Sequence, residues 1–491
     1  MDELKRFFLI WGLASLAWAQ PPDPVPTPTP AEPAPVVVPV APPKVVTHPR
    51  FLVAKGESLR FPSTAASAPP AQELLRFEKK GGAWFVTGLA PGIASFNWEK
   101  DHWDILVRER ALKLPEKGAV SVFGDYPAGA ALLHWARDFL HPRADLKEAG
   151  GVLKASGAEL IAFEAAPKVE LKSEAVEARK ADGLILSNWP EKLEEDQVLL
   201  EAPLTPEKHW RVMVHHRNMP EQPPRWLEVE IVQPAGVDER YAVTSYLTGP
   251  ASDEIFAGHL AAARYFKAPA SGYLVSVAGG KRHLLERTLI KPGQTVSAML
   301  AVRGLLPRAQ AGVLRISTRA LDNTEPLALK PFDAKARTAR GVFPAEVIRE
   351  LSYQVGSAYL FEDIGGQPYL NEVTTGSPSP GNFGAVYRYR WKLDNPTDQP
   401  QEVRMEMSAR GGPARASIWL DGESIETELL KAEPRLLKRW LLPPASKREV
   451  VMETFPQAGS NFPLSVTLSS RAPSNTPDTP APETLPNYYI P

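Results

Sequence analysis

The stretch Tyr387-Arg-Tyr-Arg-Trp-Lys-Leu393 alternates aromatic or aliphatic residues with cationic ones. Successive side chains of a β-strand point to opposite faces of a sheet, so this pattern predicts a strand with one aromatic face and one cationic face. Similar short alternating runs, separated by Gly and Pro turn signals, recur through most of the chain. The sequence therefore predicts a mainly β fold.

A second stretch, Arg211-Val-Met-Val-His-His-Arg-Asn-Met-Pro220, resembles the first in its pattern. The segments that follow the two runs are also alike, because Asn218-Met-Pro-Glu-Gln-Pro223 and Asn395-Pro-Thr-Asp-Gln-Pro400 each place Asn, an acidic residue, Gln and Pro in the same order. We therefore expect two hairpin turns built alike. Alignment on the asparagines puts His216 on the inward, apolar face and His215 on the outward face.

His215 and His216 are the only adjacent pair among nine histidines, so a metal or acid/base site has to be considered. Neighbouring side chains of a regular strand point to opposite faces, and the pair therefore cannot chelate one metal ion. The favoured interpretation is structural, with His216 packed on its ring and hydrogen-bonded at a nitrogen. The alternative is that His216, together with Asn218, contacts a ligand.

The two ends of the chain differ in composition from the rest. Residues 1–19 combine a charged start, an apolar run and a small-x-small site, which predicts a secretory signal peptide because the run is shorter than the roughly 20 residues of a spanning helix. Residues 20–46 and 472–491 are rich in proline, which predicts an extended linker that acts as a stalk, and a tail. We expect an exported protein of the periplasm, the cell surface or the extracellular space.

Between these ends we expect tandem β-sandwich modules with one small α+β domain, carried on the proline-rich stalk. Helical spacing of apolar residues occurs after Pro127 and again at Ser252–Phe266, and nowhere else is it as clear. The expected boundaries are 47–111 for an Ig-like β domain, 112–186 for the small α+β domain, 187–330 for a β-sandwich with one helix and 340–471 for a second β-sandwich.

The composition and the missing motifs argue against several kinds of chemistry. The absence of cysteine removes disulfides, cysteine metal sites and thiol catalysis. A net charge of −1 with mixed signs provides no basic surface for nucleic acid. No nucleophile elbow, zinc-protease motif, P-loop or dinucleotide fingerprint occurs. We therefore expect no catalytic residues, no metal and no cofactor.

Twelve tryptophans leave room for a binding surface, because flat aromatic side chains on β-sandwiches can stack on sugar rings. Trp419 alternates away from its apolar strand neighbours, which places it on the exposed face, although core packing is the favoured interpretation for the tryptophans as a group. Arg388 lies on the cationic face of the opening stretch. With His216 and Asn218, these two residues are the candidates for a binding role.

Four motifs occur in a fixed order along the chain: "SN-x-PE" at Ser187–Glu191, "HH-x-N" at His215–Asn218, a Gly-Pro step at Gly249–Pro250, and "GN-[FY]-G-x-x-Y" at Gly381–Tyr387. The set resembles a poorly characterised group of exported bacterial β-sandwich proteins, some of which carry copper-amine-oxidase-like N-terminal domains. Here residues 47–111 instead resemble bacterial Ig-like and secretin-type modules. The resemblance implies membership of that group and no particular chemistry.

From these observations we expect a non-enzymatic protein of the cell envelope that acts through protein or surface contacts, as a structural, adhesion or scaffold module. An envelope protein that binds polysaccharide is the alternative, and a hydrolase of wall polymer is less favoured. The expected partners are envelope proteins or polysaccharide, without nucleic acid. No integral membrane span is expected once the signal peptide is cleaved.

Overall fold

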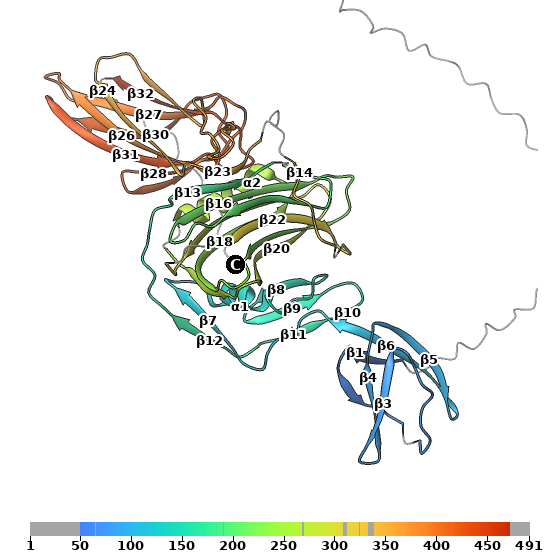
Figure 1. Cartoon of the computed structure of the whole chain (residues 1–491). Coiled ribbons are helices and arrows are strands. Elements are labelled where there is room, and N and C mark those ends of the chain that lie inside the picture. The colour runs from blue at the N-terminus through green and yellow to red at the C-terminus, as the bar shows by residue number, and fades with distance from the viewer. Residues whose placement is uncertain are drawn as a thin grey trace, which may run out of the picture. The chain divides into compact units, whose positions relative to one another are not determined.

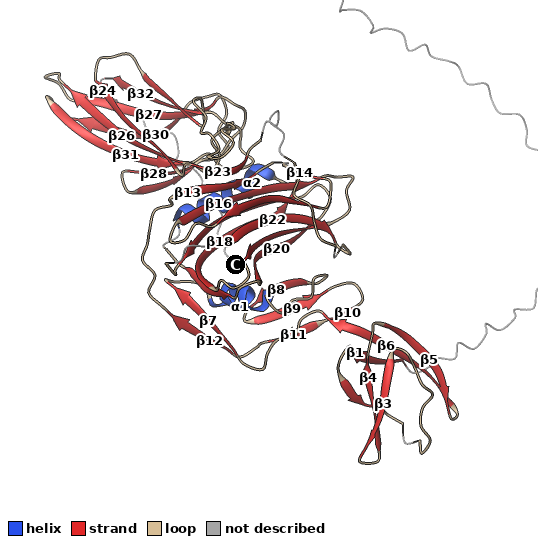
Figure 2. Ribbon diagram, in the orientation of Figure 1, coloured by secondary structure: helices blue, strands red, loops and turns tan. Residues whose placement is uncertain are grey.

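A computed structural model of the chain describes residues 50–471 except positions 64, 190, 268–269, 308–311, 324 and 332–337. The predicted signal peptide, the proline-rich linker and the proline-rich tail lie outside the described residues. Within them the chain forms strands β1 to β32 and two helices, so the mainly β prediction is confirmed (Figure 2). Neither of the described helices is long and apolar enough to cross a membrane.

The first part of the described chain forms two small sheets around an aromatic core. The ring of Phe61 lies 4.6 to 5.7 Å, between centroids, from the rings of Phe51, Phe77, Trp98 and Trp103. One sheet contains β1 (Arg50–Ala54), β5 (Gly92–Trp98), β6 (Asp101–Arg110) and β10 (Leu160–Ile161), and the other contains β2 (Ser58–Arg60), β3 (Leu75–Lys80) and β4 (Ala83–Gly88).

The segment 112–186, expected as a small α+β domain, distributes its strands over several sheets. Its β7 (Gly118–Phe123) and β12 (Val169–Ser173) pair in parallel and extend the large central sheet, because β7 also pairs with β19 (Gly272–Val277). Strands β8 (Asp145–Ala149), β9 (Val152–Ser156) and β11 (Phe163–Ala165) form a separate three-stranded sheet. The segment therefore contributes to the central sandwich.

Helix α1 (Ala128–Arg137) follows β7 and begins directly after Pro127, where helical spacing was expected. Its Arg137 donates from Nη2 to Oε2 of Glu286 at 2.6 Å, and Ser245 donates to the other oxygen of that carboxylate at 2.5 Å. The ring of His134 stacks on Tyr273 with centroids 4.1 Å apart. These buried polar and ring contacts fix α1 against the central sandwich.

Two facing sheets form the central sandwich (Figure 1), and large aliphatic side chains fill the space between them. The larger, nine-stranded sheet has the order β12-β7-β19-β18-β21-β16-β13-β23, with β14 pairing beside β16; the smaller has the order β15-β22-β17-β20. Their remaining strands are β13 (Gly183–Ser187), β14 (Lys192–Leu193), β15 (Gln197–Pro203), β16 (His209–Asn218), β17 (Arg225–Val232), β18 (Glu239–Ala251), β20 (Arg282–Ile290), β21 (Thr295–Gly304), β22 (Val313–Ala320) and β23 (Arg340–Phe343).

A second sandwich follows, again with two facing sheets and a continuous apolar core. Its sheets have the orders β24-β26-β31-β28-β29 and β25-β32-β27-β30. The strands are β24 (Glu346–Gln354), β25 (Leu360–Ile364), β26 (Val386–Asn395), β27 (Gln401–Ala409), β28 (Ser417–Leu420), β29 (Glu423–Glu426), β30 (Arg435–Leu442), β31 (Ser446–Thr454) and β32 (Leu464–Arg471).

The two sandwiches repeat one topology. The order β19-β18-β21-β16-β13 in the first corresponds to β29-β28-β31-β26-β24 in the second, and β15-β22-β17-β20 corresponds to β25-β32-β27-β30. The strand directions agree as well. In the first sandwich the one parallel pair on these paths is β13 with β16, in the second it is β24 with β26, and the other pairs on these paths are antiparallel. The chain thus contains a structural duplication, to which the first copy adds β7, β12, β14, β23 and helix α2 (Glu254–Lys267).

The segments after Asn218 and Asn395 occupy equivalent places in the two copies, but the expectation that they are hairpin turns is wrong. Strands β16 and β17 belong to opposite sheets, as do β26 and β27, so each segment is an arch that carries the chain across the sandwich. Two alternating runs joined by a short polar loop look the same in a hairpin and in an arch. Only the pairing partners of each strand distinguish them.

Each arch is held by the side-chain amide of its asparagine. Asn218 donates from Nδ2 to the carbonyls of Pro223 at 2.8 Å and Ile290 at 3.1 Å. Asn395 donates to the carbonyls of Gln399 at 2.9 Å and Leu442 at 3.1 Å. Ile290 and Leu442 end the equivalent strands β20 and β30. Each buried asparagine therefore connects its own arch to the end of β20 or β30, where the chain crosses back to the other sheet.

We predict that Asn395→Ala lowers the free energy of unfolding by about 1–3 kcal/mol, since carbonyls buried by the arch lose their donor. The measurement is urea denaturation followed by tryptophan fluorescence. Asn461→Ala is the matched control. The side chain of Asn461 likewise donates to a backbone carbonyl, that of Pro413, but it does so in an exposed loop. Equal stability of the two variants would contradict a role of Asn395 in holding the arch.

Candidate functional site

The structure separates the four predicted binding residues into two places. His216 and Asn218 lie in the central sandwich near the end of β16, and both are fully buried. Arg388 and Trp419 lie on the outer face of the second sandwich, on β26 and β28. The four residues therefore do not form one site.

His216 points into the core between the two sheets of the central sandwich. Its Nε2 lies 3.0 Å from the Oγ of Ser187 on the parallel neighbour β13. The same face of β16 carries Val212 and Val214, which belong to the central apolar core. A side chain in this place is enclosed by packed aliphatic groups, and Asn218 beside it is used by the arch.

His215 is buried too, so the face of β16 that was expected to be the outward one is not exposed at this residue. It does lie on the opposite face of β16 from His216, but that face is covered, because helix α2 packs on the neighbouring strands β18 and β21. The small residues Ala261 and Ala262 of α2 let the helix approach Met213, two residues before His215. An alternating pattern identifies two faces of a strand but not what covers them.

Burial determines the protonation state of His215. Its Nδ1 lies 2.5 Å from the Oγ of Ser297, and desolvation, with a smaller effect of His216, lowers the pKa of His215 to about 3. The ring is therefore neutral near pH 7. Its Nε2 lies 3.7 Å from a carboxylate oxygen of Glu191, which is too long for a hydrogen bond and is not an ion pair when the ring is neutral.

The four motifs converge around β13 and β16. Ser187 and Glu191 approach the two histidines as described, and Thr248, just before the Gly-Pro step, lies opposite Ser297 in the sheet. Nη1 of Arg211 donates to the carbonyl of Gly384 at 3.2 Å. A side chain at Gly384 would come within 3.2 Å of Met213 and closer still to Leu184 on β13. The motifs thus mark a packing centre where the two copies of the sandwich join.

Among the residues that the structure describes, no group of three His, Asp or Glu side chains could hold a metal ion.

Trp419 belongs to a row of residues that crosses the outer face of the second sandwich. From β28 to β24, the register places Trp419 beside Glu453, Glu453 beside Arg388 and Arg388 beside Ile348. We call these four residues the Trp419 row. Trp419 is 41% exposed and Ile348 is 59% exposed. The row thus brings together Trp419 and Arg388, two of the predicted binding residues.

The charged centre of the row is held in place by ion pairs. Arg388 contacts Glu453 from Nη1 at 3.2 Å and Glu346 from Nη2 at 3.4 Å. A guanidinium between two carboxylates keeps a defined position, and its remaining hydrogen-bonding capacity can serve a partner. The row therefore combines a flat apolar ring with fixed donors and acceptors on one sheet face.

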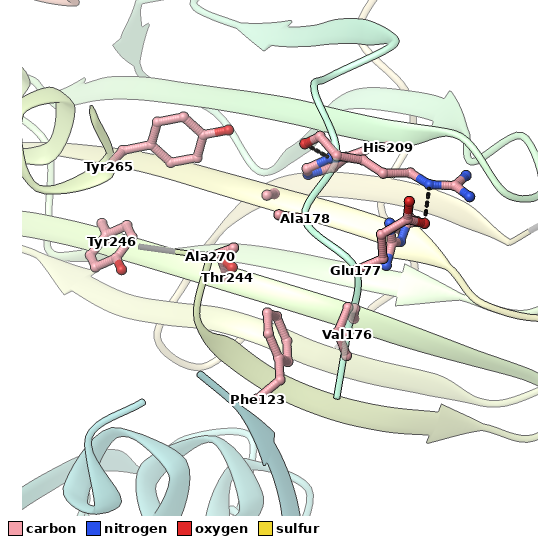
Figure 3. Close-up of a pocket in the computed structure, with 13 residues that line it drawn as sticks. Phe123, Val176, Glu177, Ala178, His209, Thr244, Tyr246, Tyr265 and Ala270 are labelled. Carbon is pink, nitrogen blue, oxygen red and sulfur yellow. Dashed lines mark hydrogen bonds and ion pairs between the residues drawn. The ribbon is translucent and has the colours of Figure 1, made fainter. Parts of the chain in front are cut away.

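A hollow of about 200 Å³ lies on the central sandwich, in a place that the sequence patterns did not indicate (Figure 3). Thr244, Tyr246 and Arg303 come from strands β18 and β21 of the nine-stranded sheet, and Tyr265 comes from the last turns of α2. The irregular segment 176–179 lies across the other side. These residues are distant in sequence and share no motif, so only the folded chain reveals the hollow.

Comparison with known proteins identifies no family. No family model and no curated protein matches the chain. Similar solved structures include a Paenibacillus xanthan lyase, which is 8% identical over 54% of this chain and 23% of that chain with a TM-score of 0.14. Tripeptidyl peptidase 2 is 11% identical over 67% of this chain and 26% of that chain with a TM-score of 0.15. Another is the CBM22-1–CBM22-2 tandem domain of Paenibacillus barcinonensis Xyn10C, which is 10% identical over 53% of this chain and 75% of that chain with a TM-score of 0.11. The chain spans about a quarter of the length of the first two, and TM-scores this low support no conclusion about fold or function.

We predict that His216→Leu lowers the free energy of unfolding by about 1–3 kcal/mol, because the buried hydroxyl of Ser187 loses its partner. Adding Ser187→Ala should recover part of this loss, since no polar group of the pair then remains. Urea denaturation of the single and double variants measures the coupling. Unchanged stability of His216→Leu combined with lost ligand binding would instead favour the ligand-contact hypothesis.

We also predict that acid destabilises the protein through its buried histidines. Desolvation lowers the pKa of His215 to about 3 and that of His259 on α2 to about 4, whereas an unfolded histidine titrates near ~6.5. Below that pH the unfolded chain binds protons that the folded chain does not. The stability that these neutral histidines contribute is therefore fully present above pH ~6.5, and it is lost as the pH falls toward their pKa values in the folded protein.

The test is the pH dependence of unfolding between about pH 6 and pH 5 for the wild type and His215→Asn. Each buried neutral histidine should contribute a slope of about 1.4 kcal/mol per pH unit, so the variant should lose about that much slope. A comparison at pH 7.5 provides the control, because there it reports only the packing cost of the substitution. Parallel pH profiles would contradict the assignment of His215 as a neutral buried group.

Proposed function

We propose that this chain is a non-enzymatic, exported protein of the cell envelope that acts by surface contact, and that the Trp419 row is its contact surface for envelope polysaccharide. The observation that carries the proposal is the exposed indole of Trp419 in register with the ion pair of Glu453 and Arg388. Export is supported by the signal-like composition of residues 1–19.

The chemistry of the row suits a sugar chain better than a purely apolar partner. The indole presents a flat apolar surface to the C–H face of a pyranose ring. Arg388 and Glu453 can donate to and accept from the hydroxyls at the edge of the ring. Val451 lies on the same face two residues before Glu453, and it is also exposed. The apolar part of the surface is therefore wider than one side chain.

The sheet geometry supports binding of an extended chain. Residues of the row lie on four adjacent strands, which are about 4.8 Å apart in any sheet, so the row is roughly 14 Å long. A polysaccharide laid across the strands would therefore contact the row with more than one sugar unit. No narrow cleft is needed for such contact, which agrees with a protein that binds a surface polymer.

We predict that polysaccharides of the bacterial envelope retard the wild type in affinity gel electrophoresis and that Trp419→Ala weakens this binding about tenfold or more, as truncation of an interface tryptophan commonly does. Leu441→Ala is the matched control, because Leu441 is 63% exposed on β30, in the other sheet of the same sandwich. It should bind like the wild type.

Equal retardation of Trp419→Ala and Leu441→Ala would show that the row is not the contact surface. No retardation of the wild type on any envelope polysaccharide would remove polysaccharide as the partner. Cross-linking mass spectrometry on intact envelopes then tests the broader proposal. Cross-links to envelope proteins would support a scaffold or adhesion role, whereas a protein found free in the medium without cross-links would contradict it.

A further inference from the structure

The hollow on the central sandwich lies on the same face of the duplicated topology as the Trp419 row. Alignment on the two asparagines equates Arg211 with Arg388, and the two lie on the equivalent strands β16 and β26. Arg211 lies opposite Ala301, which lies opposite Thr244; Arg388 lies opposite Glu453, which lies opposite Trp419. Thr244 and Ala301 line the hollow. The first copy of the sandwich thus has a hollow where the second carries its exposed tryptophan.

One end of the hollow contains an arginine for which the described residues provide no hydrogen-bond partner. Arg303 is 8% exposed, and none of the described residues accepts a hydrogen bond or forms an ion pair within 4 Å with its guanidinium. Burial, followed by the charge of Arg179, lowers the pKa of Arg303. A guanidinium has five N–H donors, and a nearly buried one without acceptors is costly to the fold.

The nearby carboxylates are engaged elsewhere. Glu177 accepts from Nε of Arg179 at 2.9 Å, as Figure 3 shows, and Asp182 accepts from the backbone N–H of His209 at 2.8 Å. Both influence Arg303 only through space. The donors of Arg303 are therefore available to an acceptor that enters the hollow.

His209 adds an acceptor beside this cation. Its Nδ1 lies 2.8 Å from the carbonyl oxygen of Arg179, and a carbonyl can only accept, so Nδ1 carries the proton. Burial lowers the pKa of His209, which keeps the ring neutral near pH 7. The other ring nitrogen, Nε2, then has a free lone pair that can accept from a hydroxyl group.

The opposite end of the hollow is aromatic. Tyr246 and Tyr265 meet edge to face, with centroids 6.5 Å apart and planes at 82°. Figure 3 shows both rings on one side of the hollow, across from Glu177 and His209. Phe123 lies at its base beside Val176. A flat ring that entered here would contact tyrosine faces and edges while its polar substituent approached Arg303.

We propose that the hollow binds a carboxylate attached to a single six-membered ring, with the carboxylate on Arg303 and the ring against Tyr246 and Tyr265. A planar carboxylate matches the fork of a guanidinium and would supply its missing acceptors. The volume of about 200 Å³ is below the roughly 300–1,000 Å³ of pockets for drug-sized ligands, which limits the occupant to about one ring. A uronic acid and an aromatic acid share this chemistry.

The test is isothermal titration calorimetry of the full chain with D-glucuronate, benzoate and neutral glucose. Binding of glucuronate alone identifies a sugar acid, binding of benzoate alone identifies an aromatic acid, and binding of both supports the shared carboxylate chemistry. Arg303→Gln should weaken binding about tenfold or more, the effect of losing a hydrogen bond between charged groups. Arg435→Gln is the matched control, an exposed arginine on β30 that should leave binding unchanged.

A second variant protects the test against misfolding of Arg303→Gln. Ala301→Leu keeps every charge but fills the hollow from β21, and it should also abolish binding. The proposal is overturned if neither acid binds, if glucose binds as tightly as the acids, or if both hollow variants bind like the wild type. Trp419→Ala should bind both acids normally, so failure here is distinguishable from failure of the polysaccharide proposal.

Discussion

Strand β16 is covered on both faces, and this double burial determines much of the surrounding chemistry. One face joins the core between the two sheets, and the other lies in the apolar cluster that helix α2 completes. The two adjacent histidines of this strand lie close to hydroxyl groups of Ser187 and Ser297, which the strands on either side provide. The burial that lowers the pKa of His215 is therefore the same packing that joins the two copies of the sandwich.

The duplication explains how one topology presents two different surfaces. In the second copy the strands β28 and β29 join through Asp421 and Gly422, both at positive φ, as a tight hairpin requires. In the first copy the equivalent strands β18 and β19 are separated by α2 and a loop. The insertion covers the central face of its sheet and leaves the hollow beside it. The second copy lacks such a cover, and Trp419 is exposed on its outer face.

The strands could be predicted from sequence where only their own pattern mattered. Alternation at 387–393 gave a buried aromatic face with Tyr389 and Trp391 inside, and helical spacing located both helices. Arches could not be separated from hairpins, because that difference depends on pairing partners far along the chain, such as Arg217 of β16 and Thr295 of β21. The ion pair that holds α1 joins Arg137 to Glu286, 149 residues further on, and no local pattern contains it.

The sequence by itself determined the class of fold, the positions of most strands, the two helices and the likeness of the segments at Asn218 and Asn395. These depend on side-chain alternation and on turn chemistry, which are local. The tertiary structure decided that His215 is buried, that Trp419 and Arg388 share a row and that Arg303 lies in a hollow. Those properties depend on which strands become neighbours and on what covers each face, and both are set by contacts between residues far apart in the chain.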